Sequence, residues 1–336
     1  MKSEERIFFP SLAIPVDEGW EIEVHAWCYH LRQRRAVIPL VRKAFGFRRA
    51  RLNTTQKETF AERARWMLAE NKRGHAIAVA AAGEIYELGK TRPNGRLRTR
   101  ITVKASEHDR QPCSVSWTQP SSAAMPLDVH FLEPEGVSVI SDIDDTIRVS
   151  HVHKRTALLH STFVEPFQPV QGMADVYRAW STRGAQFHYL SATPWQLYVP
   201  IAAFVDGHGF PKGTFHLRDF RWRDRSVLNV LSSPERYKRR TIEPLLRQLP
   251  QRTFVLVGDS GQHDPEVFGE LARHYPRQAT DLHPRCGAFD DGALSGCVRR
   301  RRSHVMAGVQ RSSEPAQDPL ILANCRKRVS SCRRRV

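Results

Sequence analysis

The chain has 336 residues, with 52 Lys and Arg against 35 Asp and Glu and a formal net charge of +17 at pH 7. Its content of 40% hydrophobic and 9% aromatic residues is that of a globular protein, which excludes wholesale disorder and collagen-like or coiled-coil architectures. No apolar run approaches the roughly 18–20 residues of a membrane-spanning helix, and the first residues lack the apolar core of a secretory signal. We therefore expect a cytoplasmic protein, long enough for one large domain or two ordinary ones.

The positive charge and the cysteines are concentrated toward the C-terminus. Residues 287–336 contain 11 Lys and Arg against four Asp and Glu, a net charge of +7, which leaves +10 for the first 286 residues. Four of the six cysteines lie at or beyond Cys286, without a CxxC pair, so neither a zinc site nor a disulfide framework is expected. A basic chain suits an anionic partner, and charge alone leaves both nucleic acid and an acidic membrane surface open.

The first 130 residues combine strand and helix patterns without an obvious reactive group. The local patterns predict an alternating strand at 21–29, an amphipathic helix with capping-box spacing between Thr55 and Glu58, and a β-hairpin formed by 75–88, a turn at 93–95, and 97–103. We interpret residues 1–130 as a smaller, β-rich accessory domain.

Residues 131–285 have the pattern of a parallel sheet. Short apolar segments alternate with helical patterns, with strands expected at 137–140, 187–190, 214–217 and 253–257 and helices at 172–182, 195–205, 235–249 and 265–274. This order favours an α/β domain with helices on both faces of the sheet, in which ligands bind at the C-terminal ends of the strands. No strand signal is found at 281–286, and we expect residues 286–336, rich in Cys and Arg, to form a flexible basic tail.

The main chemical feature is an acidic cluster directly after the apolar segment at 137–140. Asp142, Asp144 and Asp145 place three carboxylates within four residues, where they repel one another and are costly to desolvate. A divalent cation relieves that repulsion, and Mg²⁺ favours one or two carboxylates together with phosphate oxygens and water. The alternative is a solvated acidic turn, although such a turn seldom follows a fully apolar strand.

Three further features fall at the same predicted edge of the sheet. Asp259 and Asp264 come after the last of the four predicted strands, and Ser191 ends the second, beside backbone N–H groups suited to a phosphate oxygen. Lys238 lies in a basic helix. Each feature has a structural alternative on its own, because the two carboxylates also suit a capped strand-to-helix turn and the lysine also suits a solvated helix face.

The order of these features resembles the four-motif layout of the haloacid dehalogenase superfamily of phosphotransferases. Segments 136–147, 187–198 and 254–266 are similar to the catalytic domain of the Mg²⁺-dependent phosphatidate phosphatases of the actin-patch-protein type, which are distant relatives of the lipins. The resemblance extends over roughly residues 130–277, and more weakly over 20–130. It implies that residues 131–285 form a haloacid-dehalogenase-like (Rossmannoid) parallel sheet with helices on both faces.

The resemblance also implies a role for each motif residue. Asp142 would be the nucleophile that forms an aspartyl-phosphate, and Asp144 would be the general acid and then the general base. Ser191 would bind a phosphoryl oxygen, Thr146 would steady the loop beside the substrate, and Lys238 would neutralise charge on the transferring group. The implied ligands of Mg²⁺ are Asp142, Asp259, Asp264 and the backbone carbonyl of Asp144. Asp145 has no implied role beyond supporting these groups.

Weaker features surround the motifs. Three histidines after the acidic cluster either line a flap or coordinate a metal: His151, His153 and His160. A second group either contacts acyl chains or belongs to the core: Trp195, Leu197 and Tyr198. A basic loop either binds an anionic bilayer or is solvated, and it contains Arg218, Arg221, Arg223 and Arg225 with Phe220 and Trp222.

The charge and the motifs together leave three candidate functions. The first is a Mg²⁺-dependent phosphatase that acts on phosphatidate at a membrane surface, and the second is the same chemistry on a lysolipid phosphate, a nucleotide or a phosphoprotein. The third is a basic protein that binds nucleic acid, which we do not expect, because no nucleic-acid-binding motif is present and clustered carboxylates repel phosphates. We therefore interpret the positive charge as favouring peripheral binding to anionic lipid.

Overall fold

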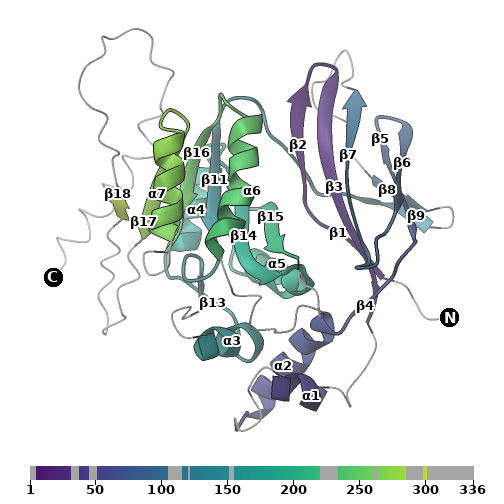
Figure 1. Cartoon of the computed structure of the whole chain (residues 1–336), viewed down its shortest axis with the longest axis vertical. Helices are drawn as coiled ribbons and strands as arrows, with labels where there is room; N and C mark the ends of the chain where they lie inside the picture. Colours follow the sequence, from purple (N-terminus) through teal and green to yellow (C-terminus); the bar gives the residue numbers. More distant parts are fainter. Residues whose placement is uncertain are drawn as a thin grey trace.

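The structure, a computed structural model, describes residues 5–31, 38–44, 51–104, 116–119, 122–150, 155–219, 234–259, 264–284 and 298–300. The antiparallel strands of the first third of the chain lie beside a second sheet that is flanked by helices, and helices α1 to α3 lie below both (Figure 1). In the part of the chain so described, no helix has both the length and the apolar character needed to cross a membrane.

The N-terminal region consists of two sheets that share one apolar core. One sheet has the strand order β1-β3-β2-β10, with β4 and β7 also paired to β3, and the other has the order β6-β5-β8-β9. Ile22 and Val24 of one sheet are buried with Ile77 and Val79 of the other, because alternate residues of each strand point to the same face. The elements are β1 (Glu5–Phe8), β2 (Ser11–Val16), β3 (Gly19–His30), α1 (Ile38–Ala44), α2 (Thr54–Met67), β4 (Glu70–Asn71), β5 (Ala76–Ala81), β6 (Glu84–Lys90), β7 (Arg96–Lys104), β8 (Ser116–Gln119), β9 (Ser122–Pro126) and β10 (Val129–Phe131).

The predicted hairpin between 75–88 and 97–103 is wrong in its pairing. β5 turns back at Ala82 and Gly83 to pair with β6, whereas β7 runs antiparallel to β3. Ala82 has a φ of 50° and Gly83 a φ of 80°, the two left-handed conformations that a tight two-residue turn requires. Ala-Gly lacks the Asn or Asp that marks such a turn in a sequence, so the pattern did not reveal it.

The capping box of helix α2 also differs from the prediction. Asn53 Oδ1 accepts a hydrogen bond from the Gln56 N–H at 2.8 Å, and Gln56 Oε1 accepts one from the Asn53 N–H at 3.0 Å. The predicted pair, Thr55 and Glu58, has the same spacing but lies inside the helix. Because Asn is as good an N-cap as Thr, the earlier pair is used and the helix begins at Thr54.

The second sheet has the strand order β15-β14-β11-β16-β17-β18. All neighbouring strands are parallel except β18, which is antiparallel to β17. This confirms the prediction of an α/β region with a parallel sheet. The elements are β11 (Val137–Asp142), β12 (Arg148–Val149), α3 (Arg155–Phe163), β13 (Gln168–Pro169), α4 (Met173–Ser181), β14 (Gln186–Pro194), the 3₁₀ helix η2 (Trp195–Leu197), α5 (Tyr198–Gly207), β15 (Gly213–Arg218), α6 (Pro234–Gln248), β16 (Thr253–Val257), α7 (Asp264–His274), β17 (Ala279–Pro284) and β18 (Val298–Arg300).

Each face of this sheet buries a separate apolar cluster. Val139 belongs to the cluster formed with helices α4 and α5, whereas its neighbour Ile140 belongs to the cluster formed with α6 and α7. Successive residues of a strand point to opposite faces, so a continuous apolar run is needed to fill both clusters. In Figure 1, α6 and α7 lie in front of the sheet and α4 lies behind it.

Strand β17 corrects the expectation that 281–286 carries no strand. Its residues from Ala279 to Leu282 pair in parallel with β16. The segment is too short and too polar to show an apolar pattern, and it becomes a strand because the edge of β16 supplies hydrogen-bond partners. Of the predicted basic tail, Val298–Arg300 forms β18, and the rest lies outside the described residues.

A buried arginine fixes the chain between the two regions. Arg252 Nη1 donates to the carbonyl oxygens of Glu133 at 2.7 Å and Glu135 at 2.5 Å, and its Nη2 donates to that of Val137 at 3.1 Å. Its Nε donates to Ser138 Oγ at 2.7 Å. The chain from the segment after β10 to the first residue of β11 is therefore held at three alternate carbonyl positions.

The same serine also contacts a buried histidine. His188 in β14 is fully buried, and its two ring nitrogens lie 2.7 Å from Thr214 Oγ1 and 3.1 Å from Ser138 Oγ. Burial, with the nearby charges of His216 and Arg252, lowers the pKa of His188 well below its usual value. The folded protein therefore keeps this ring neutral.

We expect His188 to make the protein less stable in mild acid. Its pKa is lower in the folded than in the unfolded chain, so its contribution is complete above about pH 6.5 and is lost as the pH falls. Between pH 7.5 and 5.5 the loss is at most about 1.4 kcal/mol, the limit for a ring that stays neutral in the folded chain over this range. Denaturant unfolding of the wild type, of His188→Asn and of the exposed-site control His274→Asn would measure it. If the stability of His188→Asn changed with pH as much as that of the wild type, the assignment would be contradicted.

Candidate active site

Three neighbouring strands end together and define the site. In the register of the sheet, Asp142 of β11 lies opposite Leu190 of β14, and Ser141 lies opposite Val257 of β16. Ser191 and the loop after β16 consequently lie at the same edge as the acidic cluster. This is the edge at which parallel sheets bind ligands, so the structure brings the predicted motifs together.

Lys238 of helix α6 lies between two of the predicted carboxylates. Its Nζ is 2.6 Å from Asp142 Oδ1 and forms a close ion pair with Asp264 Oδ1. All three side chains are almost fully buried, which makes this a desolvated triad rather than a surface salt bridge. The two carboxylates raise the pKa of Lys238 above its usual value, although burial opposes them.

Asp144 has its own partners. Its Oδ2 accepts a hydrogen bond from Ser191 Oγ at 2.8 Å, and its Oδ1 accepts a close one from Arg148 Nη2. Burial would raise the pKa of Asp144, but the guanidinium of Arg148 and the hydroxyl of Ser191 outweigh it and hold this pKa below its usual value. The carboxylate is thus fixed at both oxygens and favours the ionised form.

The loop that carries these residues is tightly folded. Asp145 adopts a left-handed φ of 56°, which Asp tolerates better than most residues. Its Oδ1 accepts hydrogen bonds from the N–H of Ser150 at 2.6 Å and from the Ser150 hydroxyl at 3.1 Å. The Asp145 N–H in turn donates to the carbonyl oxygen of Arg148 at 2.7 Å. Asp145 therefore braces the loop, a local role for which the sequence offered no specific signal.

The loop after β16 depends on the lack of a side chain at Gly258. A Cβ atom at this position would lie 2.5 Å from Asp264 Oδ2 and 2.6 Å from the ring of Phe268. Asp259, the next residue, is 2% exposed. Gly258 thereby allows the end of β16 to lie close against Asp264 at the start of α7.

The remaining predicted residues have different outcomes. Thr146 is buried, and its hydroxyl has no hydrogen-bond partner among the described residues, so the structure shows none of the loop-steadying hydrogen bonds expected of it. His160 of α3 has its Nδ1 3.4 Å from Oε1 of Glu165, in the segment after this helix. Trp195 and Leu197 are buried core residues and Tyr198 packs against that core. His151, His153, Phe220, Arg221, Trp222, Arg223 and Arg225 lie outside the described residues.

The electrostatic balance of the site is negative. Burial raises the pKa of Asp142 well above its usual value; Lys238 opposes this rise, whereas the charges of Asp264 and Asp144 add to it. Two buried cations, Lys238 and Arg148, accompany four buried carboxylates at this edge. An ionised cluster therefore carries two more negative than positive charges, which is costly in a desolvated site.

The donor set for a metal is incomplete in side chains alone. Within the described ranges, no group of three or more His, Cys, Asp or Glu is arranged to hold a metal ion. Asp142 Oδ2 and Asp264 Oδ2 are nevertheless buried and make no hydrogen bond to the described residues. Two carboxylate oxygens with water suit Mg²⁺, which keeps several of its waters when it binds a protein.

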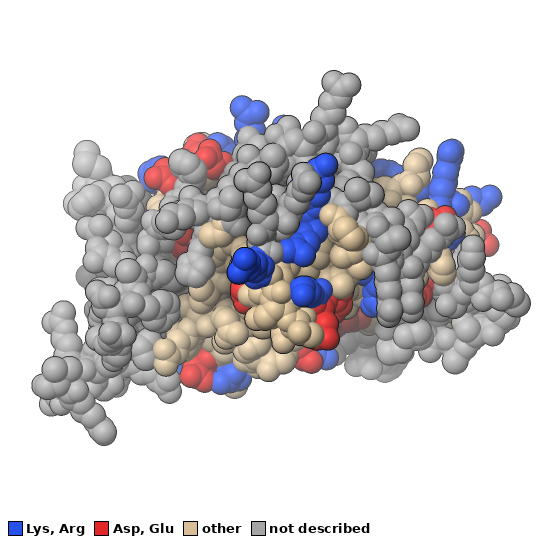
Figure 2. Space-filling view, turned by 90° about the horizontal axis from the view of Figure 1, so that it is seen from below, with Lys and Arg blue, Asp and Glu red and all other residues tan. Residues whose placement is uncertain are grey.

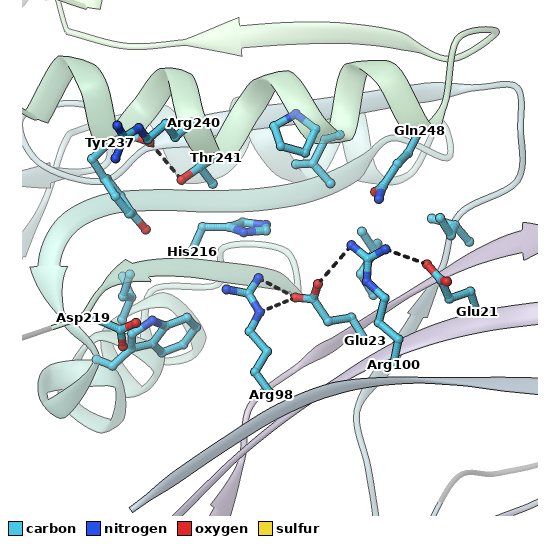
Figure 3. A pocket seen from close by; sticks show the side chains of 16 residues that line it. Glu21, Glu23, Arg98, Arg100, His216, Asp219, Tyr237, Arg240, Thr241 and Gln248 are labelled. Carbon is cyan, nitrogen blue, oxygen red and sulfur yellow. Dashed lines mark hydrogen bonds and ion pairs between the residues drawn. The ribbon is translucent and has the colours of Figure 1, made fainter. Parts of the chain in front are cut away.

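A cavity of about 380 Å³ lies elsewhere, between the N-terminal region and the second sheet. Figure 3 shows Arg98 and Arg100 of β7 facing Glu23 and Glu21 of β3 along one wall of it. Arg100 Nη1 is 3.0 Å from Glu21 Oε1, and Arg98 forms a close ion pair with Glu23. None of the clustered aspartates lines this cavity, so we place the reactive site at the strand ends instead.

Arg148 is the site residue that the motif analysis did not single out. It follows Asp144 by four residues and is 1% exposed. A weak signal was present, because Arg148 follows the acidic cluster closely and stands between the apolar residues Ile147 and Val149. One sequence without an alignment did not separate it from the many other arginines.

Comparisons with known proteins bear on the same segment. Residues 137–283 match the family model described as "Phosphatidate phosphatase APP1, catalytic domain". An uncharacterized protein of Schizosaccharomyces pombe is 29% identical over 162 residues, which is 47% of this chain and 26% of that protein. Phosphatidate phosphatase APP1 of Saccharomyces cerevisiae is 29% identical over 161 residues, 47% of this chain and 27% of that protein. The chain thus spans about a quarter of the length of the curated relatives it matches.

Among solved structures, one described as the active site of a carbohydrate esterase aligns with 87% of this chain and 91% of that chain. The identity is 9% and the TM-score is 0.22. A likeness this low carries no argument about fold or function.

We expect Gly258→Ala to destabilise the protein by about 1–3 kcal/mol, because the added methyl group overlaps the Asp264 carboxylate and Phe268. The matched control is Gly207→Ala in α5, where nothing lies within 4 Å of the new Cβ and the better helix propensity of Ala gives no loss of stability. Denaturant unfolding of both variants would measure the difference. Equal stability of the two would contradict the close approach at Gly258.

Proposed function

We propose that this chain is a phosphatase that hydrolyses phosphatidate to diacylglycerol and phosphate, because residues 137–283 match the family model of the phosphatidate phosphatase APP1 catalytic domain. The observation that carries the proposal is the buried Asp142 at the end of β11, held by Lys238 at 2.6 Å beside a second fixed carboxylate, Asp144. We further propose that the parallel sheet is of the haloacid-dehalogenase type, with the N-terminal region as an accessory domain.

The proposed reaction has two steps. Asp142 attacks phosphorus with a carboxylate oxygen, the bond from phosphorus to the glycerol oxygen breaks, and an aspartyl-phosphate forms. Asp144, which must take up a proton before this step because its neighbours favour its ionised form, gives that proton to the departing alkoxide and then takes one from the water that hydrolyses the aspartyl-phosphate, which releases phosphate. Lys238 and Ser191 neutralise and orient the transferring group, since phosphoryl transfer depends chiefly on positioning and charge.

We propose Mg²⁺ as the cofactor of this reaction. Two observations support it: the buried oxygens Asp142 Oδ2 and Asp264 Oδ2 make no hydrogen bond to the described residues, and the cluster has two excess negative charges. The proposed ligands are Asp142, Asp259, Asp264 and the carbonyl of Asp144. When bound, the ion supplies positive charge to the phosphoryl oxygens.

We propose that the protein works in the cytoplasm at the surface of anionic membranes. The net charge of +17 supports this location, because anionic lipid attracts basic proteins. Figure 2 shows Lys and Arg side chains projecting among uncharged residues near the centre of the face seen from below. Binding of nucleic acid without catalysis is disfavoured, because the clustered carboxylates repel phosphates unless a metal ion is bound.

We expect Asp142→Asn to lower phosphate release from phosphatidate vesicles at least about 1000-fold, because the amide is not a nucleophile. The matched control is Asp206→Asn, an exposed aspartate of α5, which should retain wild-type activity. Release of phosphate from vesicles at several Mg²⁺ concentrations is the measurement.

The outcomes separate the candidate functions. Full activity of Asp142→Asn would overturn the assignment of the nucleophile. Hydrolysis of soluble phosphomonoesters by the wild type, without hydrolysis of vesicles, would replace phosphatidate by another phosphomonoester. Salt-sensitive retention on DNA without phosphatase activity would overturn the enzymatic proposal.

We expect Mg²⁺ to raise the thermal unfolding midpoint of the wild type, by the equivalent of about 1–3 kcal/mol at 10 to 100 times its dissociation constant. Asp264→Asn should lose this rise, whereas Asp206→Asn should keep it. Thermal melts with Mg²⁺ and with a chelator would measure both. If Mg²⁺ left the unfolding midpoint of the wild type unchanged, the ion would be excluded as a resident cofactor. If Mg²⁺ still raised the midpoint of Asp264→Asn, Asp264 would be excluded as a ligand.

A further inference from the structure

An arginine of the N-terminal region lies inside the catalytic part of the molecule. Arg63 of helix α2 is 5% exposed, although arginines are rarely buried without a partner. Its Nη1 donates to the carbonyl oxygens of Thr162 at 2.8 Å and Glu165 at 2.7 Å. Thr162 lies in the last turn of α3, where backbone carbonyls lack partners within the helix and attract a cation, and Glu165 lies two residues beyond the helix.

Arg63 and Arg148 share two neighbours. The Arg63 guanidinium carbon lies 3.8 Å from the centroid of the Phe167 ring, and that of Arg148 lies 4.4 Å from the same centroid. Thr162 also meets both, because its carbonyl oxygen accepts from Arg63 and its hydroxyl lies 3.3 Å from Arg148 Nη2. The Phe167 ring and two oxygens of Thr162, all of which attract cations, thus lie between the like-charged guanidinium groups of Arg63 and Arg148.

Arg148 relies on these neighbours for its position. Its Nε and Nη1 are buried and have no hydrogen-bond partner among the described residues, so Nη2 alone makes its polar contacts there, to Asp144 and Thr162. The planar guanidinium is otherwise oriented by the Phe167 ring. A shift of Phe167 or Thr162 would therefore move Arg148, and with it the Asp144 carboxylate.

We propose that Arg63 is a positioning residue for the general acid and base Asp144, acting through Phe167, Thr162 and Arg148. The proposal rests on the proposed function, because it assumes the role of Asp144 given there. Arg63 itself contacts neither Asp144 nor Asp142 within the described structure. The N-terminal region thereby supplies part of the catalytic geometry and is more than a support for the sheet.

The test uses two substrates that differ in their need for a general acid. The alkoxide that leaves phosphatidate must be protonated, whereas the p-nitrophenolate that leaves p-nitrophenyl phosphate departs without a proton. Loss of position at Asp144 therefore lowers kcat/KM for the first substrate more than for the second. General damage to the fold or to the nucleophile lowers both alike.

The variants are Arg63→Met, which removes the charge and the hydrogen bonds, and Arg63→Lys, which restores a cation of similar reach. Phe167→Leu breaks the same connection from the other side. The matched control is Arg65→Met, an exposed arginine on the same helix. Thermal melts establish that each full-length variant is folded at the assay temperature.

We expect Arg63→Met and Phe167→Leu to lower kcat/KM for phosphatidate by about 10- to 100-fold and for p-nitrophenyl phosphate by less than about 3-fold. The loss should fall on kcat, with KM nearly unchanged, because neither residue touches the substrate. Arg63→Lys should recover part of the activity, and Arg65→Met should match the wild type.

Three results would overturn the proposal. Equal losses on the two substrates would show a merely structural role, and wild-type activity in folded Arg63→Met would show no role. If Arg63→Met did not fold, the same comparison would be decided by Arg63→Lys and Phe167→Leu. A wild type that hydrolysed neither substrate would overturn the proposed function itself, and the inference with it, whereas activity on both with equal losses would overturn the inference alone.

Discussion

The arrangement of the site depends on one buried cation held between two buried carboxylates. Without Lys238, Asp142 and Asp264 would face each other in a desolvated space, where unpaired charges cost several kcal/mol each. Helix α6 must therefore pack with Lys238 at this edge, and its apolar residues Ile242 and Leu246, fully buried in the core, anchor the same helix against the sheet. The packing of α6 and the electrostatics of the site are thus one constraint.

The sequence was sufficient to predict that the motifs meet, because parallel strands end at one edge and their following loops lie together. Asp142, Ser191 and Asp264 illustrate this rule, since each follows a strand whose apolar pattern was plain. Arg63 shows where the rule ends. It lies about 80 residues before the acidic loop, and no local pattern distinguishes it from Arg65, so only the packing of α2 against α3 reveals its contact.

Two fold elements show the same limit in backbone terms. The turn at Ala82 depends on a left-handed φ that alanine rarely adopts, and the pairing of β7 with β3 is set by the sheet rather than by the turn before it. Strand β17 has an unremarkable composition and forms because β16 offers an open edge. In each case tertiary contacts outweighed local preference, which a pattern in one sequence does not record.

The clamp at Arg252 has a consequence for how the molecule meets a surface. Arg252 donates hydrogen bonds to the carbonyls of Glu133, Glu135 and Val137, in the chain that connects the N-terminal sheets to the second sheet. These hydrogen bonds restrict hinge motion of the connecting segment. Two regions joined in this way rotate together. Any lipid or protein that docks on the N-terminal sheets therefore also sets the direction in which the strand ends with the clustered aspartates face.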